Sequence, residues 1–215
     1  AGFVYGDMTS VAVSEDGSKL AVAIQAENYA DTGRVALFTC NADGTLTFDK
    51  VYETGVQPDM VTFASNDSKI LTADEGEPRD GYGDGIIDPK GTVTIINLAD
   101  QTVSQVDFTS YDNSDSREQL VESGVILKKN TNPSVDFEPE YIAVGDKTAY
   151  VTLQEANAIA VIDLNQQSLT GVYSAGYEDY STCAVDIDKK DEAYNQQFMR
   201  HYEEYVCLMG LQHII

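Results

Sequence analysis

The sequence predicts an all-β fold, a β-propeller built from four-stranded antiparallel blades, with about three and a half blades in the chain. Two observations carry this prediction. A pair of strand-like runs joined by a tight turn occurs three times, and two further strand-like runs follow each pair. Units of four strands that repeat every 40 to 50 residues or so are typical of propeller blades. An immunoglobulin-like sandwich or a barrel is the alternative, but neither has a reason to repeat in fours.

The paired runs align with one another. The first runs of the three pairs are DMTSVAVSEDG at 7–17, PDMVTFASND at 58–67 and PEYIAVGD at 139–146. The second runs are SKLAVAIQAEN at 18–28, SKILTADEGEP at 68–78 and KTAYVTLQEAN at 147–157. Asp, Asn and Gly stand between the two runs of each pair, and these residues tolerate the backbone dihedrals of tight turns. Each pair is therefore predicted to form a β-hairpin.

Two more runs complete each unit, and they set the expected blade boundaries. They are GRVALFT with LTFDKVYE, GTVTIINL with TVSQVDF, and AIAVIDL with SLTGVYS. The blades are then expected at about 9–53, 60–108 and 141–173, and a fourth begins at 183. Alternating apolar residues should face the neighbouring blades. These residues are Val11, Val13, Val61, Phe63, Ile142 and Val144.

Two insertions and an atypical tail interrupt the repeat. The segment 76–91 is rich in Gly, Asp and Pro, which indicates a loop inside the second blade. Within 111–138, Ser114 or Ser116 can cap a short helix that runs through Ser123 and ends at Gly124. Residues 1–195 then form a partial propeller domain, and 196–215 form a tail that is helix-like in composition. This tail, or a second copy of the chain, could cover an open blade face.

Composition restricts the partners. The formal net charge is −23, which repels nucleic acid and anionic lipid headgroups, so neither is expected as a partner. The excess of acidic residues serves either solubility or cation binding. No run approaches the 20 or so apolar residues of a transmembrane helix. The sequence also opens without the basic region of a signal peptide, so a mature secreted or cell-surface chain is expected.

The cysteine and histidine residues offer little catalytic chemistry. The three cysteines lie far apart without CxxC spacing, which argues against a disulfide framework and a zinc site. His201 and His213 both lie in the tail, so a Ser-His or Cys-His pair is not expected.

Carboxylates are the candidate metal ligands. Asp80, Asp84 and Asp88 recur every fourth residue in the loop DGYGDGIID, between glycines whose carbonyls are also free to bind a cation. Calcium prefers six to eight or so oxygen ligands of this kind. The spacing differs from that of an EF-hand, and a solvated Gly/Asp turn is the alternative.

A second carboxylate group lies beside strand ends in two neighbouring blades. It comprises Glu75, Glu77, Glu138 and Glu140. If these side chains converge on the central channel, they would either bind a cation or share protons, with raised pKa values. Otherwise Glu138 and Glu140 cap loops or pair with Lys128, Lys129 and Lys147 at the surface.

The sequence resembles the choice-of-anchor I domain family. The most specific stretches are DEGEP at 74–78 and EPEYIAV at 138–144, and the resemblance extends over about 7–195. It implies a bacterial secreted or surface-anchored propeller with more blades than this sequence supplies, sometimes labelled alkaline-phosphatase-like. Beyond residue 195 the sequence departs from the family pattern.

Two classes of function remain open at this point. The first is a non-catalytic surface scaffold that binds a protein or a glycan at a loop face. The second is a calcium-dependent phosphoester hydrolase of the propeller phytase kind, in which bound calcium neutralises the phosphate. Such a hydrolase needs basic side chains to hold phosphate, yet Arg79 is the only arginine in a candidate site. The scaffold is therefore favoured.

Overall fold

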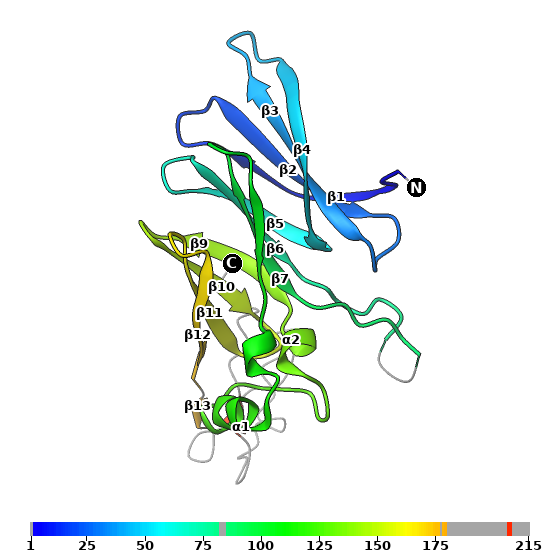
Figure 1. Ribbon diagram of the computed structural model, residues 1–215, viewed down its shortest axis with the longest axis vertical. Coiled ribbons are helices and arrows are strands. Elements are labelled where there is room, and N and C mark those ends of the chain that lie inside the picture. The colour runs from blue at the N-terminus through cyan, green and yellow to red at the C-terminus, as the bar shows by residue number, and fades with distance from the viewer. Residues whose placement is uncertain (1, 82–84, 177, 180–205, 208–215) are drawn as a thin grey trace, which may run out of the picture.

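The computed structural model describes residues 2–81, 85–176, 178–179 and 206–207. Its main feature is a set of three four-stranded antiparallel sheets that follow one another along the chain (Figure 1). In each sheet the strands are hydrogen-bonded in sequence order, which is the strand order of a propeller blade. The predicted all-β fold with four-stranded blades is therefore confirmed.

The strand bounds are as follows. The first sheet contains β1 (Tyr5–Val13), β2 (Lys19–Ala26), β3 (Thr32–Cys40) and β4 (Leu46–Val56). The second contains β5 (Pro58–Ala64), β6 (Lys69–Asp74), β7 (Thr92–Asn97) and β8 (Val103–Val106). The third contains β9 (Pro139–Val144), β10 (Thr148–Leu153), β11 (Ala158–Asp163) and β12 (Ser168–Ser174). Two short strands, β13 (Glu178–Asp179) and β14 (Val206–Cys207), pair with each other.

The sheets pack face to face through two apolar cores. The core between the first and second sheets is built from small and branched side chains such as Ala21, Val35 and Ile70, all fully buried. The larger core between the second and third sheets includes Leu71, Val151 and other aliphatic residues. Burial of these side chains on both faces of the second sheet explains why its strands are apolar throughout, with little alternation.

The alternating apolar residues were predicted to face neighbouring blades. This prediction is confirmed in the second and third blades and is wrong in the first. Val61 and Ile142 are 2% and 5% exposed and pack against the preceding sheet. Val11 and Val13, in contrast, are 62% and 57% exposed. They occupy the same kind of face, but in the described part of the structure no sheet lies against the outer face of the first one.

The long insertion carries three short helices and closes the larger core. They are η1 (Thr109–Tyr111), α1 (Ser114–Glu122) and α2 (Pro133–Asp136), which lie beside the third sheet in Figure 1. The cap of α1 is Asn113 rather than the expected Ser114 or Ser116, because the Asn113 side chain accepts a hydrogen bond from the Ser116 N–H at 2.9 Å. Gly124 follows the helix with φ of 98°, as expected for a helix stop.

The last part of the chain lies largely outside the described residues. This applies to the fourth blade expected from 183 and to most of the helix-like tail at 196–215. Residues 206–207 of the tail are described, and they form the short strand β14. Among the described helices, none is long and apolar enough to cross a membrane.

Candidate functional site

The candidate site lies at the end of the sheets where the blade connections meet the β2–β3 and β6–β7 loops. Gln57, in the β4–β5 connection, is buried and ties these segments together. Its side-chain amide donates hydrogen bonds to the carbonyl oxygen of Tyr29 at 3.1 Å and to that of Glu77 at 2.7 Å. The Nε of Arg79 donates to the Gln57 side-chain oxygen at 3.1 Å. The loops at this end are therefore fixed in place by hydrogen bonds.

Irregularities in the first strand of each sheet aim side chains into this site. In β5, Pro58 pairs with Asp74 and Met60 with Ala73, so Asp59 is the extra residue of a β-bulge. A corresponding irregularity near the start of β9 contains Glu140. Bulges re-aim a side chain relative to the regular alternation of a strand, and they are frequent next to functional sites. In β1 the equivalent extra residue is Thr9.

The end of β6 and the loop after it supply two more carboxylates, both paired with one arginine. Arg79 lies 3.5 Å from the Glu75 carboxylate and 3.2 Å from that of Glu77. The Glu75 side chain is only 16% exposed, whereas that of Arg79 is 46% exposed. Arg79 therefore neutralises this side of the site from its solvent-facing edge.

On the other side, the insertion brings a lysine to two buried acids. The Lys128 Nζ lies 3.0 Å from the Glu138 carboxylate and 3.3 Å from that of Asp136. Both carboxylate side chains are almost fully buried. The two buried carboxylates therefore share the ammonium group of Lys128. Its positive charge is divided between them, so it offsets the charges of the nearby carboxylates less.

Six carboxylates at this end act electrostatically on one another, and we call them the carboxylate rim. Its members are Asp59, Glu75, Glu77, Glu138, Glu140 and Glu155. The sequence left open whether Glu75, Glu77, Glu138 and Glu140 converge or whether Glu138 and Glu140 pair with lysines. Glu138 does pair with Lys128, at 3.0 Å, and the charges of the four glutamates also act on one another. Asp59 and Glu155 were missed by the sequence reasoning, although the equivalence of Pro58-Asp59 and Pro139-Glu140 in the repeat was a usable signal.

Burial and mutual repulsion raise the pKa values of the rim. Loss of water around Glu140, followed by the charges of Glu155 and Glu75, raises its pKa to about 8. Burial, followed by the charges of Glu77 and Asp59, raises the pKa of Glu75 to about 7. Burial also raises the pKa values of Asp59 and Glu138, against the opposing effects of Arg79 and Lys128, respectively. At neutral pH the rim therefore holds protons that a cation could replace.

Asp80 and Asp88, the two loop aspartates that the structure describes, do not form one group with the rim. Asp80 accepts a hydrogen bond from the Tyr29 hydroxyl at 3.1 Å. Asp88 interacts electrostatically with Lys128 and Asp136 instead, and burial raises its pKa. Asp84 lies outside the described residues. Within the described part of the chain, no set of three or more His, Cys, Asp or Glu side chains is arranged as a metal site.

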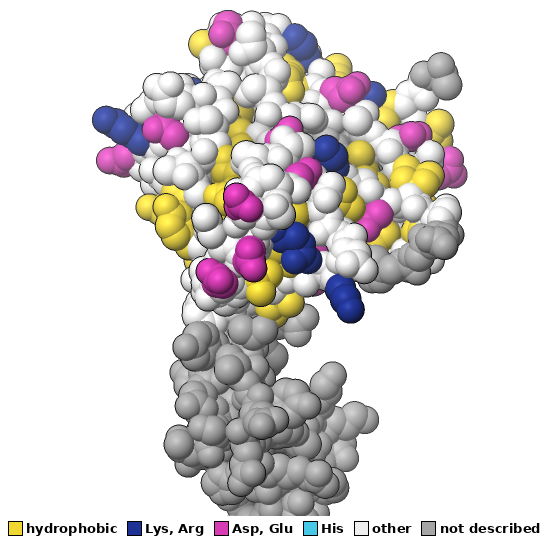
Figure 2. Space-filling view, turned by 60° about the horizontal axis from the view of Figure 1, so that its bottom comes forward, with side chains coloured by type: hydrophobic (Ala, Val, Ile, Leu, Met, Phe, Trp, Pro, Cys, Tyr) yellow, Lys and Arg dark blue, Asp and Glu magenta, His cyan; other side chains and the backbone are white. Residues whose placement is uncertain are grey.

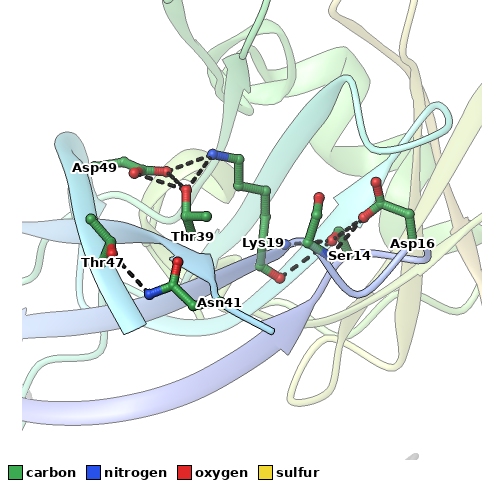
Figure 3. A network of polar contacts seen from close by, with 8 residues as sticks. Ser14, Asp16, Lys19, Thr39, Asn41, Thr47 and Asp49 are labelled. Carbon is green, nitrogen blue, oxygen red and sulfur yellow. Dashed lines mark hydrogen bonds and ion pairs between the residues drawn. The ribbon is translucent and has the colours of Figure 1, made fainter. Parts of the chain in front are cut away.

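A separate polar network lies on the first sheet and has a structural role. Figure 3 shows Lys19 of β2 reaching Asp49 of β4, with Nζ 2.6 Å from the carboxylate, and Thr39 of β3 between them. At the β1–β2 turn, Ser14 donates a hydrogen bond to Asp16 at 2.8 Å. These residues satisfy one another across neighbouring strands, so the network stabilises the sheet and leaves no group poised for chemistry.

The fold defines a class, a β-propeller-like domain, here with an acidic loop end. The family model of the choice-of-anchor I domain matches residues 1–203, and the chain belongs to this family. No curated protein shows significant sequence similarity to the chain.

Solved structures with a similar fold are distant in sequence. A chain of the nidogen/laminin complex has a TM-score of 0.45 and 11% identity, over 78% of this chain and 47% of that one. Hydrazine synthase from Kuenenia stuttgartiensis has a TM-score of 0.49 and 12% identity, over 76% of this chain and 49% of that one. The chain thus spans about half the length of each.

Proposed function

We propose that the chain is a non-catalytic, extracellular or cell-surface binding module that holds a positively charged ligand at the carboxylate rim. The observation that carries the proposal is the mutual electrostatic interaction of six carboxylates at one loop end of the sheets. Calcium is the candidate ion, and its binding would require the rim side chains to move closer together, because no three of the described ones are arranged as a metal site. A basic surface of a partner protein is the candidate macromolecular ligand. Both are matched by oxygen ligands that carry excess negative charge.

Glu140 is the centre of this proposal. It is half-buried, and within the described residues it forms no ion pair. Four other carboxylates act on it, so its ionised form is disfavoured until a cation arrives. A bound cation would remove the repulsion and displace the protons that the rim holds near neutral pH. Ligand binding and proton release are therefore coupled.

Calorimetric titration of the full chain with calcium at pH 8 or so tests the proposal. The parent should bind calcium, and Glu140→Gln should weaken binding by at least about tenfold, which corresponds to about 1.4 kcal/mol. Asp146→Asn, an exposed change in the β9–β10 turn, is the matched control and should bind like the parent. Equal calcium binding by the parent and Glu140→Gln would show that the rim is not the binding site. A second titration with magnesium in place of calcium tests the selectivity for the ion.

A calcium-dependent phosphoester hydrolase is the second candidate. The feature that favours it is the pair Glu75 and Glu140, whose pKa values of about 7 and 8 suit proton transfer near neutral pH. The feature that weakens it is Arg79, which is already paired with Glu75 and Glu77 and so is poorly placed to hold phosphate. A phosphatase assay with and without calcium separates the two functions. Calcium-dependent turnover that Glu140→Gln abolishes would favour the hydrolase over the binding module.

A further inference from the structure

The outer face of the first sheet is an uncovered apolar surface. Six of its large side chains come from β1 and β4, and each of them is between 43% and 66% exposed. They are Met8, Val11, Val13, Leu46, Phe48 and Val51. Strand register places them on one face, because Val11 pairs with Val22, Val22 with Ala36, and Ala36 with Val51. Contiguous exposure of this kind marks an interaction surface.

The repeat shows what kind of surface fits this face. Val11 and Val13 are equivalent to Val61 and Phe63 of the second sheet, which pack against the first sheet. They are also equivalent to Ile142 and Val144 of the third sheet, which pack against the second sheet. The outer face of the first sheet therefore has the side-chain pattern that, twice in this chain, packs against another four-stranded sheet.

The third sheet presents the complementary face. Tyr150 occupies the repeat position of Ala21 and Leu71, which are fully buried against the next sheet along the chain. Tyr150 itself is 47% exposed, and Tyr141 and Tyr173 on the same face are also exposed. Tyrosine covers apolar surface with its ring and keeps its hydroxyl in water, which suits the edge of an interface.

Both faces are nearly free of net charge, although the chain carries −23. On the first sheet, Arg34 and Glu53 lie in the same row as Met8, and they neutralise each other at 3.1 Å. On the third sheet, the exposed large side chains are uncharged tyrosines, and one carboxylate, that of Asp163, lies at the end of this face, where it accepts hydrogen bonds from the Asn165 and Gln166 N–H groups. Elsewhere, Figure 2 shows Asp and Glu side chains spread over the molecule between hydrophobic ones. Two faces with so little net charge, on a strongly acidic chain, can approach each other without close repulsion.

We propose that the outer face of the first sheet binds the outer face of the third sheet of a second copy of the chain. The two faces would pack as the first and second sheets, and the second and third sheets, pack within one copy. This association is head-to-tail, because the repeat pairs these two kinds of face and never pairs one kind with itself. Such contacts join copies into rings or longer arrays. The inference is independent of the carboxylate rim.

Light scattering of the full chain after size separation, over a range of micromolar concentrations, tests the proposal. The parent should show a mass of at least twice that of one chain, and added salt should increase the association because it screens the net charge. Val11→Lys and Tyr150→Lys should each remain monomeric up to a much higher concentration than the parent. Gln119→Lys, on the exposed side of α1, adds the same charge and should leave association unchanged.

Mixing the two variants provides the sharper measurement. The Val11→Lys chain keeps an intact third-sheet face, and the Tyr150→Lys chain keeps an intact first-sheet face. An equimolar mixture should therefore form pairs that stop at two copies, and circular dichroism should show that both variants are folded. If Tyr150→Lys alone associates like the parent, the first-sheet faces pair with each other and the proposal is wrong.

A monomeric parent at all concentrations would also overturn the proposal. In that case, labelling of a Val11→Cys variant identifies the alternative occupant. Slow labelling would mean that residues of the same chain outside the described part cover the face, and fast labelling would mean that the face stays open to solvent.

Discussion

Gly91 lies so close to Pro139 that a Cβ on Gly91 would come within 2.5 Å of the Pro139 Cδ and would overlap the carbonyl oxygen of Phe137. Gly33 makes the equivalent contact with Pro58 one blade earlier. In both cases the glycine precedes or begins the third strand of a blade, and the proline begins the first strand of the next blade. Two blade junctions therefore use the same backbone-to-proline contact.

Gly91→Ala is expected to destabilise the chain by about 2 kcal/mol, because the added methyl group overpacks a junction formed by backbone and a rigid ring. At this chain length, that loss lowers the midpoint of thermal unfolding by roughly 4–8 °C. Gly145→Ala is the control, since its Cβ would meet only the Thr148 carbonyl oxygen, at 3.6 Å. Equal midpoints for the two variants would show that the junction adjusts without strain.

Asp74 joins the first and second sheets by a buried set of hydrogen bonds. Its carboxylate accepts bonds from the Gly55 N–H at 3.1 Å, from the Thr94 hydroxyl at 2.6 Å and from the Thr72 hydroxyl at 2.7 Å. Thr92 donates to the same carboxylate at 3.0 Å. These donors face a fully buried acceptor, so its loss would leave several polar groups unsatisfied.

Asp74→Ala should therefore lower the free energy of unfolding by about 3 kcal/mol. Asp74→Asn should also destabilise the chain, because an amide NH2 group would face hydroxyl and N–H donors. Asp100→Asn is the control, since Asp100 makes similar bonds to Thr102 at an exposed turn and its replacement should change little. Urea unfolding measures all three variants, and a parent-like Asp74→Asn would contradict the role assigned to the acceptor.

The blades could be predicted from the sequence because the pattern of four strands remains recognisable in each unit even where insertions lengthen the loops between the strands. The sequence could not show that Val11 and Val13 are exposed, since strand alternation identifies a face but not whether another sheet covers it. The cap of α1 was expected at Ser114 or Ser116, one or three residues too late, because Asn and Ser are both good caps and only the backbone conformation decides between them.

The rim was predicted in part, for a similar reason. Glu75 and Glu140 lie beside strand ends, and strand ends of neighbouring blades meet at one edge of the stack. Asp59 lies in a bulge, which breaks the regular alternation of the strand, and only its equivalence to Glu140 in the repeat could have indicated it. Asp88 was grouped with Asp80 by spacing alone, but the long loop carries it toward Asp136. Spacing predicts proximity only where the backbone between the residues is regular.

Lys128→Met is expected to destabilise the chain by about 3 kcal/mol, because it removes a cation from Glu138 and Asp136, both nearly fully buried. The loss should be larger at neutral pH than at pH 5 or so, where the carboxylates can take up protons instead. Lys90→Met is the control, since Lys90 is exposed. A loss in Lys128→Met that is the same at both pH values would mean that its aliphatic chain, not its charge, stabilises the region.

The rim should also make the parent chain less stable as pH rises through the neutral range. Folding raises the pKa of Glu140 from 4.5 to about 8 and that of Glu75 from 4.5 to about 7, so between these values the folded chain binds more protons than the unfolded chain. The free energy of unfolding must then fall with increasing pH over this window. The groups whose pKa values are lowered, such as Asp49, lose their stabilising effect only on the acidic side of the window.

Without divalent cations, the midpoint of thermal unfolding should accordingly be higher at pH 5.5 or so than at about pH 8.5. Glu140→Gln removes the group with the larger of these two pKa shifts, so its midpoint should depend less on pH, whereas Glu118→Gln on the exposed side of α1 should follow the parent. Calcium should restore the midpoint at the higher pH if it binds the ionised rim, by an amount that grows with its concentration. A parent midpoint that rises between the two pH values would show that the rim carboxylates are ionised and well solvated in the folded chain, against the burial seen here.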